Sequence, residues 1–220
     1  MGYGQIAIDG PAGAGKSTIA KLVAKELGFL YVDTGAMYRA ITLKALKLNI
    51  DLQDENSYRF LEETTLDFNQ NVIYLDGVDV SKEIRKAVIN KNVSLVSSFK
   101  YVREKLVAYQ KQIAVNHPVV MDGRDIATVV LPNADLKIFL TAKAETRAQR
   151  RYLELPQSEK EKTTIEELIA DIKRRDHFDS TRTNSPLVKA LDAIEIDTSY
   201  DSIEEVCKKI INLYKFKGVH

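Results

Sequence analysis

Residues 10–17 read GPAGAGKS, and they are the most informative residues for the fold. It has the pattern G-x-x-x-x-G-K-S and directly follows a short apolar run, QIAID, at residues 5–9. Residues 16–27 have helical periodicity and end at Gly28, a residue type that commonly ends helices. Because a phosphate-binding loop needs a strand before this pattern and a helix after it, the sequence predicts such a loop, or P-loop, here.

The residue types of the P-loop explain how it would hold ATP. Its glycines let successive backbone N–H groups point at phosphate oxygens, and the N-terminus of the following helix adds a favourable dipole for an anion. Lys16 is expected to carry a positive charge to the β and γ phosphates, and the Ser17 hydroxyl to ligate Mg²⁺. The residues expected to contact ATP are Gly10, Pro11, Ala12, Gly13, Ala14, Gly15, Lys16, Ser17 and Thr18.

Two other interpretations of the loop are weaker. A glycine-rich turn that ends in Lys-Ser by chance would not need the flanking strand and helix. A GTPase switch usually recognises guanine with an Asn-Lys-x-Asp segment, and the sequence contains none. The loop does not identify the phosphate acceptor, because one fold serves many reactions.

Composition narrows the class of protein. The 220 residues fit one domain, and 45% hydrophobic residues can fill its core. The net charge of +1 gives no argument for binding nucleic acid or a membrane surface, and no run approaches the roughly 18 apolar residues of a membrane helix. A single cysteine, Cys207, is typical of a reducing compartment. We expect a cytoplasmic monomer.

The order of elements predicts an α/β fold with a parallel sheet. Strands at 5–9 and 29–33 alternate with helices at 16–27 and 35–47, an order typical of parallel strands covered by helices. Later strands are expected at 119–122, 136–140 and 193–197, and a helix at 144–153. Thr164 with Glu167 predicts a capping box that opens a helix to about 178, and Ser202 with Glu205 predicts the cap of the terminal helix.

The middle of the chain interrupts this alternation. Residues 65–80 read TLDFNQNVIYLDGVDV, with bends expected at Asn-Gln-Asn (69–71) and at Asp-Gly (76–77). Short alternating runs separated by such bends predict a small antiparallel meander inserted into the α/β body. Helices are expected to follow over residues 81–116.

Arginines flank a polar, proline-containing segment, LPQSEKEKT, at residues 155–163, which we expect to be an exposed flap. Before it, Arg147, Arg150 and Arg151 share one helical face by their spacing; after it come Arg174, Arg175 and Arg182. A solvated surface charge is the alternative for any one of them. As a group they suit a mobile lid, because a kinase must neutralise phosphate charge and exclude water.

Four segments together resemble bacterial cytidylate kinases. They read IAIDGPAGAGKST (6–18), YVDTGAMYRA (31–40), MDGRDIATVV (121–130) and IKRRDHFDSTR (172–182). The first is shared with many P-loop proteins, whereas DTGAMYR and DGRD, with the meander between them, are more specific.

The resemblance extends from about residue 5 to the terminal helix, and it implies a nucleoside monophosphate kinase fold. That fold has a five-stranded parallel core, an acceptor-binding lobe enlarged by a small antiparallel sheet, and a lid. The implied division of the single kinase domain is a core at 1–34, 117–150 and 183–220, an acceptor-binding lobe at 35–116, and a lid with its flanking helix at 151–182.

The resemblance also implies transfer of the γ-phosphoryl group from ATP, with Mg²⁺, to CMP or dCMP. Arg39 and Arg124 would hold the acceptor phosphate, and Thr34 keeps a hydroxyl where some members have serine. Ser94, Arg103 and Asp125 would face the cytosine, Arg175 and Asp179 the ribose, and Arg182 the phosphates. The implied catalytic cations are Lys16, Arg124, Arg147, Arg150, Arg151 and Arg182.

The contacts to the base make chemical sense by themselves. Cytosine offers an N4 amine donor beside its N3 and O2 acceptors, so a carboxylate such as Asp125 can accept from the amine while Arg103 or Ser94 donates to the ring. Uracil presents an O4 acceptor instead and would face a carboxylate unfavourably. Asp125 has two alternative roles: it could be a structural partner of Arg124, or it could cap the following segment.

Asp122 ends the apolar run VVMD, where a P-loop sheet often presents an acidic residue to the waters of Mg²⁺. A loop aspartate at a strand end is the alternative, and Asp33 has the same ambiguity. Two other functions remain open: a P-loop kinase for another small acceptor such as UMP, and a switch that binds ATP without turnover.

Overall fold

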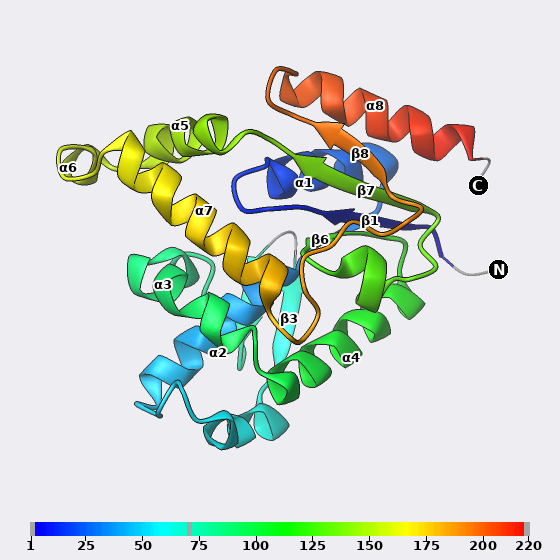
Figure 1. Ribbon diagram of the computed structural model, residues 1–220. Helices are drawn as coiled ribbons and strands as arrows, with labels where there is room; N and C mark the ends of the chain where they lie inside the picture. Colours follow the sequence, from blue (N-terminus) through cyan, green and yellow to red (C-terminus); the bar gives the residue numbers. More distant parts are fainter. Residues whose placement is uncertain (1–2, 70–71, 218–220) are drawn as a thin grey trace.

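The computed structural model of the protein describes residues 3–69 and 72–217, and a parallel sheet lies at its centre (Figure 1). The strands of this sheet are β1 (Gln5–Asp9), β2 (Leu30–Asp33), β6 (Val119–Gly123), β7 (Leu136–Thr141) and β8 (Ile194–Asp197). Their order is β2-β6-β1-β7-β8, and every neighbouring pair is parallel. The predicted α/β fold with a five-stranded parallel sheet is therefore confirmed.

Helices cover both faces of the sheet, and the alternation along β1 explains why. Ile6 and Ile8 point to one face and Ala7 to the other, because successive strand residues face opposite sides. All three are fully buried, as strands covered on both faces require. The covering helices are α1 (Lys16–Leu27) and α8 (Ile203–Phe216) on the face of Ile6, and α2 (Thr34–Lys47) and α4 (Lys100–Asn116) on the opposite face (Figure 1).

Three adjacent strands have an aspartate as their last or next-to-last residue, at the same edge of the sheet. The register places Asp9 of β1 beside Gly123 of β6, and Asp33 of β2 beside Asp122 of β6. In open parallel sheets, ligands bind at the edge formed by the carboxyl ends of the strands. The fold therefore gathers these carboxylates where the P-loop leaves β1.

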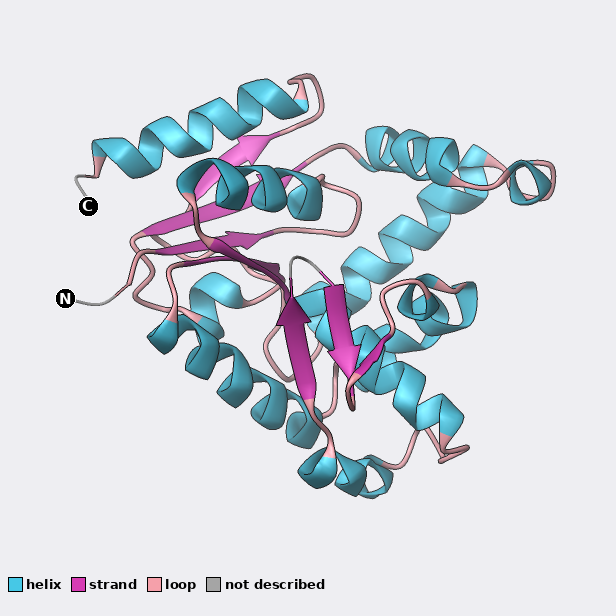
Figure 2. Ribbon diagram, turned by 180° about the vertical axis from the view of Figure 1, so that it is seen from behind, coloured by secondary structure: helices cyan, strands magenta, loops and turns pink. Residues whose placement is uncertain are grey.

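The segment between β2 and β6 contains the predicted antiparallel meander, which is confirmed. Its strands are β3 (Leu66–Asn69), β4 (Val72–Leu75) and β5 (Val78–Asp79), paired in that order. They stand below the main sheet when the molecule is seen from behind (Figure 2). Asp76 and Gly77 both have positive φ, as the tight turn between β4 and β5 needs. The other expected bend includes residues 70 and 71, which lie outside the described residues.

The helices expected over 81–116 are present in the same segment. The chain turns at Ser97–Phe99, before α4 begins at Lys100. A 3₁₀ run that the sequence analysis did not predict begins where the Asp54 carboxylate accepts the Asn56 backbone N–H at 3.0 Å. The elements besides α2 and α4 are η1 (Glu55–Glu63), η2 (Glu83–Arg85) and α3 (Ala87–Val96).

Three helices form an arm that projects from the body of the molecule (Figure 1). They are α5 (Ala144–Glu154), α6 (Gln157–Lys160) and α7 (Ile165–Thr181). The predicted capping box opens α7: the Thr164 hydroxyl accepts the Glu167 N–H at 3.1 Å, and the Glu167 carboxylate accepts the Thr164 N–H at 2.9 Å. The helix continues three residues beyond the predicted end, which brings Asp179 into its last turn.

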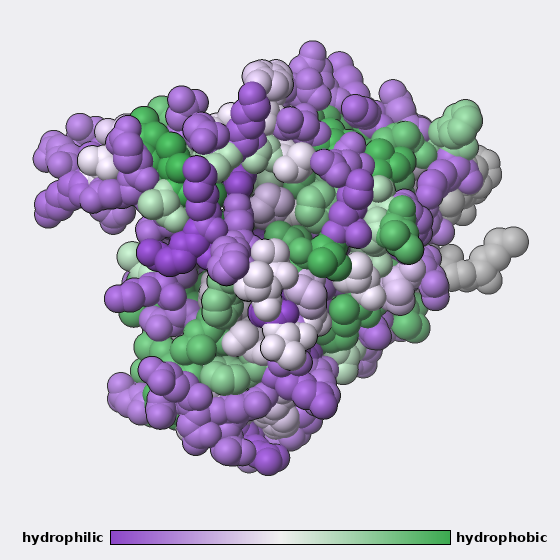
Figure 3. Space-filling model, viewed as in Figure 1, coloured by the Kyte–Doolittle hydropathy of each residue, from purple (hydrophilic) through white to green (hydrophobic). Residues whose placement is uncertain are grey.

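The predicted flap at 155–163 contains the single-turn helix α6, which buries none of its side chains. Figure 3 shows mostly hydrophilic residues at this tip of the arm, at the left of the view. Within residues 3–69 and 72–217, no helix combines the length and the apolar character needed to cross a membrane.

Candidate active site

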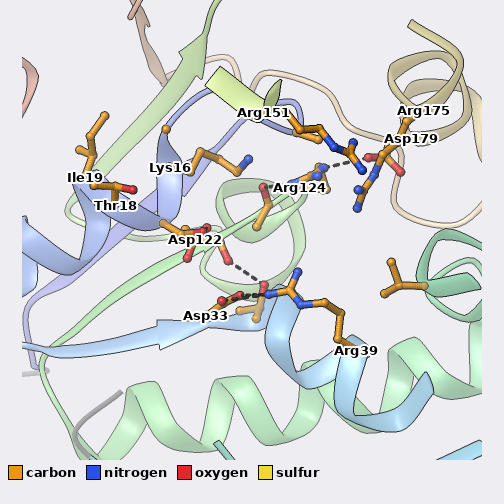
Figure 4. Close-up of a pocket in the computed structure, with 18 of the residues that line it drawn as sticks. Lys16, Thr18, Ile19, Asp33, Arg39, Asp122, Arg124, Arg151, Arg175 and Asp179 are labelled. Carbon is orange, nitrogen blue, oxygen red and sulfur yellow. Dashed lines mark hydrogen bonds and ion pairs between the residues drawn. The ribbon is translucent and has the colours of Figure 1, made fainter. Parts of the chain in front are cut away.

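A cleft of about 570 Å³ opens at the carboxyl edge of the sheet, between the P-loop, the segment that follows β2 and the arm (Figure 4). Four of the residues predicted from sequence are not among its lining residues: Gly10, Pro11, Ala14 and Arg147. The predicted residues that line it together are Ala12, Gly13, Gly15, Lys16, Ser17, Thr18, Thr34, Arg39, Ser94, Arg103, Asp122, Arg124, Asp125, Arg150, Arg151, Arg175, Asp179 and Arg182.

The P-loop has the backbone shape that anion binding requires. Gly15 precedes α1 with a left-handed backbone (φ 84°), and no side chain caps the first N–H groups of the helix. These N–H groups therefore face the loop, where they can donate to an anion. A Cβ at Gly10 would lie 2.0 Å from the Leu140 carbonyl oxygen, so only glycine fits against β7 at this position.

Lys16 is 6% exposed, and its Nζ donates to the Pro11 carbonyl oxygen at 2.8 Å. Burial, followed by the charge of Arg124, lowers the pKa of Lys16 below its ordinary value. Both effects disfavour the ammonium form. An anion in the loop would stabilise that form, so the site favours a phosphate near Nζ.

Asp122 is held by two hydroxyl groups. Ser17 Oγ and Tyr31 Oη donate to its two carboxylate oxygens, each at 2.9 Å. Burial, and then the charge of Asp33, raise the pKa of Asp122. The adjacent hydroxyl of Ser17 and carboxylate of Asp122 are hard oxygen donors, the type that Mg²⁺ prefers, and they lie beside the P-loop. These residues therefore fit a Mg²⁺ ion, although their metal role stays a prediction.

Asp33 has different contacts. Its carboxylate accepts the Ala36 N–H at 2.7 Å and caps α2, and it forms an ion pair with Arg39 at 3.0 Å (Figure 4). Thr34, the next residue, donates its hydroxyl to the Asp122 carbonyl oxygen at 2.7 Å. The strand-end aspartates thus divide: Asp122 faces Ser17, and Asp33 anchors the helix that presents Arg39.

Positive charge accumulates where α7 meets the DGRD segment. Figure 4 shows Arg124, Arg151 and Arg175 converging beside Asp179. Arg124 Nε donates to Asp179 at 2.8 Å; burial acts to raise the pKa of Asp179, but the charge and hydrogen bond of Arg124 lower it below its ordinary value. Burial, followed by Arg124, lowers the pKa of Arg175 to about 10. One close carboxylate does not balance this cluster, so it favours an anionic ligand.

Two buried donor atoms support the same conclusion. Arg175 Nε and Arg182 Nη2 are buried and have no hydrogen-bond partner among the described residues. Arg182 Nε donates to the Ser185 carbonyl oxygen at 2.7 Å, which fixes the side chain at the edge of the cleft. Because an unpaired buried donor costs stability, these atoms indicate a site that a ligand completes.

At another wall of the cleft, Asp125 forms a buried ion pair with Arg103. Arg103 also donates to the Ser97 carbonyl oxygen at 3.1 Å, and its guanidinium lies 5.4 Å from the centre of the Tyr38 ring. Asp125 therefore has neither alternative role: Arg124 pairs with Asp179, and the Asp125 side chain makes no cap bond. Ser94 lines the cleft as well.

The three arginines of α5 have separate roles in spite of their shared helical face. Arg147 is buried, and it donates to Asp176 of α7 at 2.6 Å, to Ala142 O at 2.9 Å and to Ala12 O at 3.0 Å. Arg150 lines the cleft and donates to Thr198 Oγ1 at 3.1 Å. Only Arg150 and Arg151 line the cleft, whereas Arg147 joins the arm to the P-loop.

Sequence reasoning missed several residues of the site. Thr198 lines the cleft and donates its hydroxyl to Ala14 O at 3.1 Å, across 184 positions of sequence. The only feature of the sequence that could have indicated Tyr31 is its polar group two residues before Asp33. For Tyr38, the only such feature is its place in the segment DTGAMYR. The capping box at Ser202 predicts the start of α8 but not that this start faces the P-loop. The further lining residues in this region are Asp201, Ile203 and Val206.

Comparisons with known proteins agree over nearly the whole chain. A sequence profile of the family described as cytidylate kinase matches residues 6–216. A cytidylate kinase of Alkaliphilus oremlandii (strain OhILAs) is 55% identical over 216 residues, which cover 98% of this chain and 99% of that protein. A cytidylate kinase of Acholeplasma laidlawii (strain PG-8A) is 51% identical, with 98% and 97% covered.

Among solved structures, an uncharacterized protein from Eubacterium ventriosum ATCC 27560 aligns with a TM-score of 0.52 and 14% identity. The alignment covers 97% of this chain and 99% of that one. At this identity the likeness concerns the fold alone.

Proposed function

The chain belongs to the cytidylate kinase family, and we propose that its cleft transfers the γ-phosphoryl group of ATP to CMP or dCMP. One observation carries the proposal beyond membership of the family. A P-loop, the buried Arg103–Asp125 pair and a cluster of arginines line the same cleft. This arrangement supports a donor site, a phosphate site and a site for a polar base within one cleft.

The donor half consists of the P-loop and the start of α1. In the proposed complex, Lys16 exchanges the Pro11 carbonyl oxygen for phosphate oxygens, which restores its full charge. Ser17 and Asp122 would hold Mg²⁺, which neutralises charge on the β and γ phosphates when it is bound with ATP. Thr198 and the start of α8 line the cleft beside the P-loop and would contact the nucleoside part of ATP.

The acceptor half uses the remaining arginines. Arg39 and Arg124 would hold the phosphate of CMP, and Arg175 with Asp179 would contact the ribose. Arg182 and the arginines of α5 would neutralise charge during transfer. The acceptor phosphate is already ionised near neutral pH, so direct in-line transfer needs neither a dedicated base nor a covalent intermediate.

The Arg103–Asp125 pair would select the base. Asp125 can accept from the N4 amine of cytosine, while Arg103 or Ser94 donates to the ring acceptors. Uracil presents an acceptor at the same place, and a buried carboxylate would face it without a proton between them. A buried polar group left unpaired in this way gives strong discrimination between two substrates of the same shape.

We further propose that residues 35–116 act as the acceptor-binding lobe and that residues 151–182 act as a lid. The lack of buried side chains in α6 and the place of Arg151 among the residues that line the cleft support this division. A cytoplasmic location and a monomeric state stay predictions.

A coupled assay with ATP, Mg²⁺ and a panel of nucleoside monophosphates tests the proposed function. Turnover is expected with CMP and dCMP, and much slower turnover with UMP. Preference for UMP would identify a kinase for another acceptor. ATP binding without turnover of any monophosphate would instead indicate a switch that does not catalyse transfer.

A further inference from the structure

Asp9 is the last residue of β1 and directly precedes the P-loop. Its carboxylate is 1% exposed and accepts two backbone N–H groups of a distant segment, from Ile126 at 2.9 Å and from Ala127 at 2.8 Å. We propose that Asp9 is a positioning residue, which fixes Arg124 and Asp125 in the acceptor site by capping the helical turn that follows them.

The turn needs a cap from elsewhere. The π-helical turn η3 (Ile126–Val130) begins directly after Asp125, and the first N–H groups of a helical segment have no partner within it. An aspartate in the N-cap position normally accepts these N–H groups with its own carboxylate. Asp125 occupies that position but makes no such bond, because its carboxylate is paired with Arg103. Asp9 supplies the missing acceptors and so leaves Asp125 free to face the cleft.

The backbone around this turn has little freedom to move. In the register of the sheet, Asp9 lies beside Gly123, the residue before Arg124. A Cβ at Gly123 would lie 2.7 Å from both Ile126 Cδ1 and Thr34 Oγ1, so the chain is tightly packed there. Asp9 holds the other side of the DGRD segment with two hydrogen bonds. The backbone of the segment is therefore fixed, and with it the positions from which the Arg124 and Asp125 side chains extend.

The charges around Asp9 are consistent with this role. Burial raises the pKa of Asp9 to about 6, and Asp125 adds to the rise; the two backbone N–H groups and Lys16 act against it. At the pH of a kinase assay, near 7.5, the carboxylate is therefore ionised and can accept both N–H groups, and this bonding joins the start of the P-loop to the segment that contacts the acceptor.

The inference rests on the proposed function, and a measured preference for CMP over UMP is its readout. Asp9→Asn keeps the size of the side chain but turns an N–H donor toward a backbone N–H. We expect kcat/KM with CMP to fall about 10-fold and the preference for CMP over UMP to shrink by a similar factor. The affinity for ATP, measured by calorimetry without acceptor, should change less than about 2-fold, because the P-loop keeps its own contacts.

Asp135→Asn is the matched control. Asp135 also accepts a backbone N–H of β1, from Gln5 at 2.7 Å, but at the opposite end of the strand and away from the cleft. It should lower the unfolding temperature and leave the CMP preference unchanged. If the Asp9→Asn protein does not fold, Asp9→Ser replaces it, because serine retains one acceptor and removes the buried carboxylate. This variant should lose part of the preference.

A double-mutant cycle with Asp125→Asn completes the test. If Asp9 acts through Asp125, Asp9→Asn should change the CMP preference by less than about 2-fold once Asp125 has been replaced. Equal losses with CMP and UMP, or independent effects of the two substitutions on the preference, would overturn the inference. Wild-type protein that does not prefer CMP would refute the proposed function instead, so the two failures are distinguishable.

Discussion

Asp125 forms its ion pair with Arg103, which lies 22 positions earlier, and not with the adjacent Arg124. Arg124 donates instead to Asp179 at the end of α7. The two neighbouring charges of the DGRD segment therefore serve different walls of the cleft. This separation lets one short segment contact both the base and the phosphate of a nucleotide, and it makes the two roles separable by substitution.

Asp125→Asn should reduce the use of CMP and narrow the difference between CMP and UMP. The asparagine amide can donate to uracil O4, whereas the carboxylate cannot. We expect kcat/KM with CMP to fall by about 10- to 100-fold, with the KM for ATP little changed, as for the loss of a charge-assisted bond in a desolvated site. Steady-state kinetics with both acceptors measure this. Equal losses with CMP and UMP would make Asp125 a scaffold for Arg103.

ATP binding at pH 8 should be accompanied by proton uptake at Lys16. Burial and Arg124 lower the pKa of Lys16 in the free protein, so part of the population is neutral at this pH. Phosphate charge raises the pKa again, and a proton must be taken from the solvent. Calorimetry in buffers of different ionisation enthalpy should therefore report net uptake.

The control for this measurement is Lys16→Ala. Among the described residues, the Lys16 side chain donates only to the Pro11 carbonyl oxygen of the loop. The variant should therefore fold, lose turnover and bind residual nucleotide without this uptake. Turnover of CMP at a near wild-type rate by the variant would contradict the assignment of the P-loop. Equal uptake by both proteins would contradict the lowered pKa.

As the pH rises, the free energy of unfolding of the wild-type protein should fall relative to that of Asp9→Asn, because Asp9 is buried. Its folded pKa of about 6 lies above the ordinary value of 3.8, so between these values the folded state binds more protons than the unfolded state. From pH 5 to pH 7.5, the free energy of unfolding of the wild type should fall by about 1.4 kcal/mol relative to the variant. Urea unfolding at both pH values measures it, and a relative gain with rising pH would refute the shift.

Arg147 and Arg151 should respond differently to replacement by lysine. Arg147 makes four hydrogen bonds, three of which join α5 to Asp176 of α7 and to Ala12 of the P-loop, and lysine cannot reproduce this planar set of donors. Arg147→Lys should therefore cost about 2 to 4 kcal/mol of unfolding free energy. Arg151→Lys should leave stability within about 0.5 kcal/mol and lower kcat. Lower kcat without loss of stability in Arg147→Lys would instead support the catalytic role that the resemblance to cytidylate kinases implies.

The local parts of the fold could be predicted from sequence because local signals determine them. The P-loop, the meander and the two capping boxes each depend on residues within a few positions of one another. Helical spacing also predicts correctly that Arg147, Arg150 and Arg151 share a face. It cannot show that this face meets Asp176 at one point and the cleft at another, because that depends on how α5 and α7 pack.

Two contacts that the sequence analysis missed join residues far apart in the chain. Asp9 and Ile126 are 117 positions apart, and Thr198 and Ala14 are 184 apart. Nothing in the apolar run QIAID distinguishes a carboxylate that caps another segment from one that begins the P-loop. The π-helical turn after Asp125 likewise has no pattern of its own, since it depends on the bonds that Asp9 supplies.

Residues 153–163 should be sensitive to protease in the free protein and protected when both nucleotide sites are filled. The segment includes α6, which buries no side chain, so few contacts hold it closed without ligand. Arg150 and Arg151 lie just before it and would bring it over the cleft when they bind phosphate. Limited proteolysis with and without a bisubstrate analogue, followed by mass spectrometry of the fragments, measures the protection.

Lys16→Ala serves as the control for the same digestion, because it should fold but bind the analogue weakly and so remain sensitive. Protection of the wild type but not of this variant would connect closure to occupancy of the P-loop. Equal cleavage of the wild type with and without the analogue would show that residues 153–163 do not close. The role of 151–182 as a lid would then be wrong, while the assignment of the P-loop and of Asp125 would be unaffected.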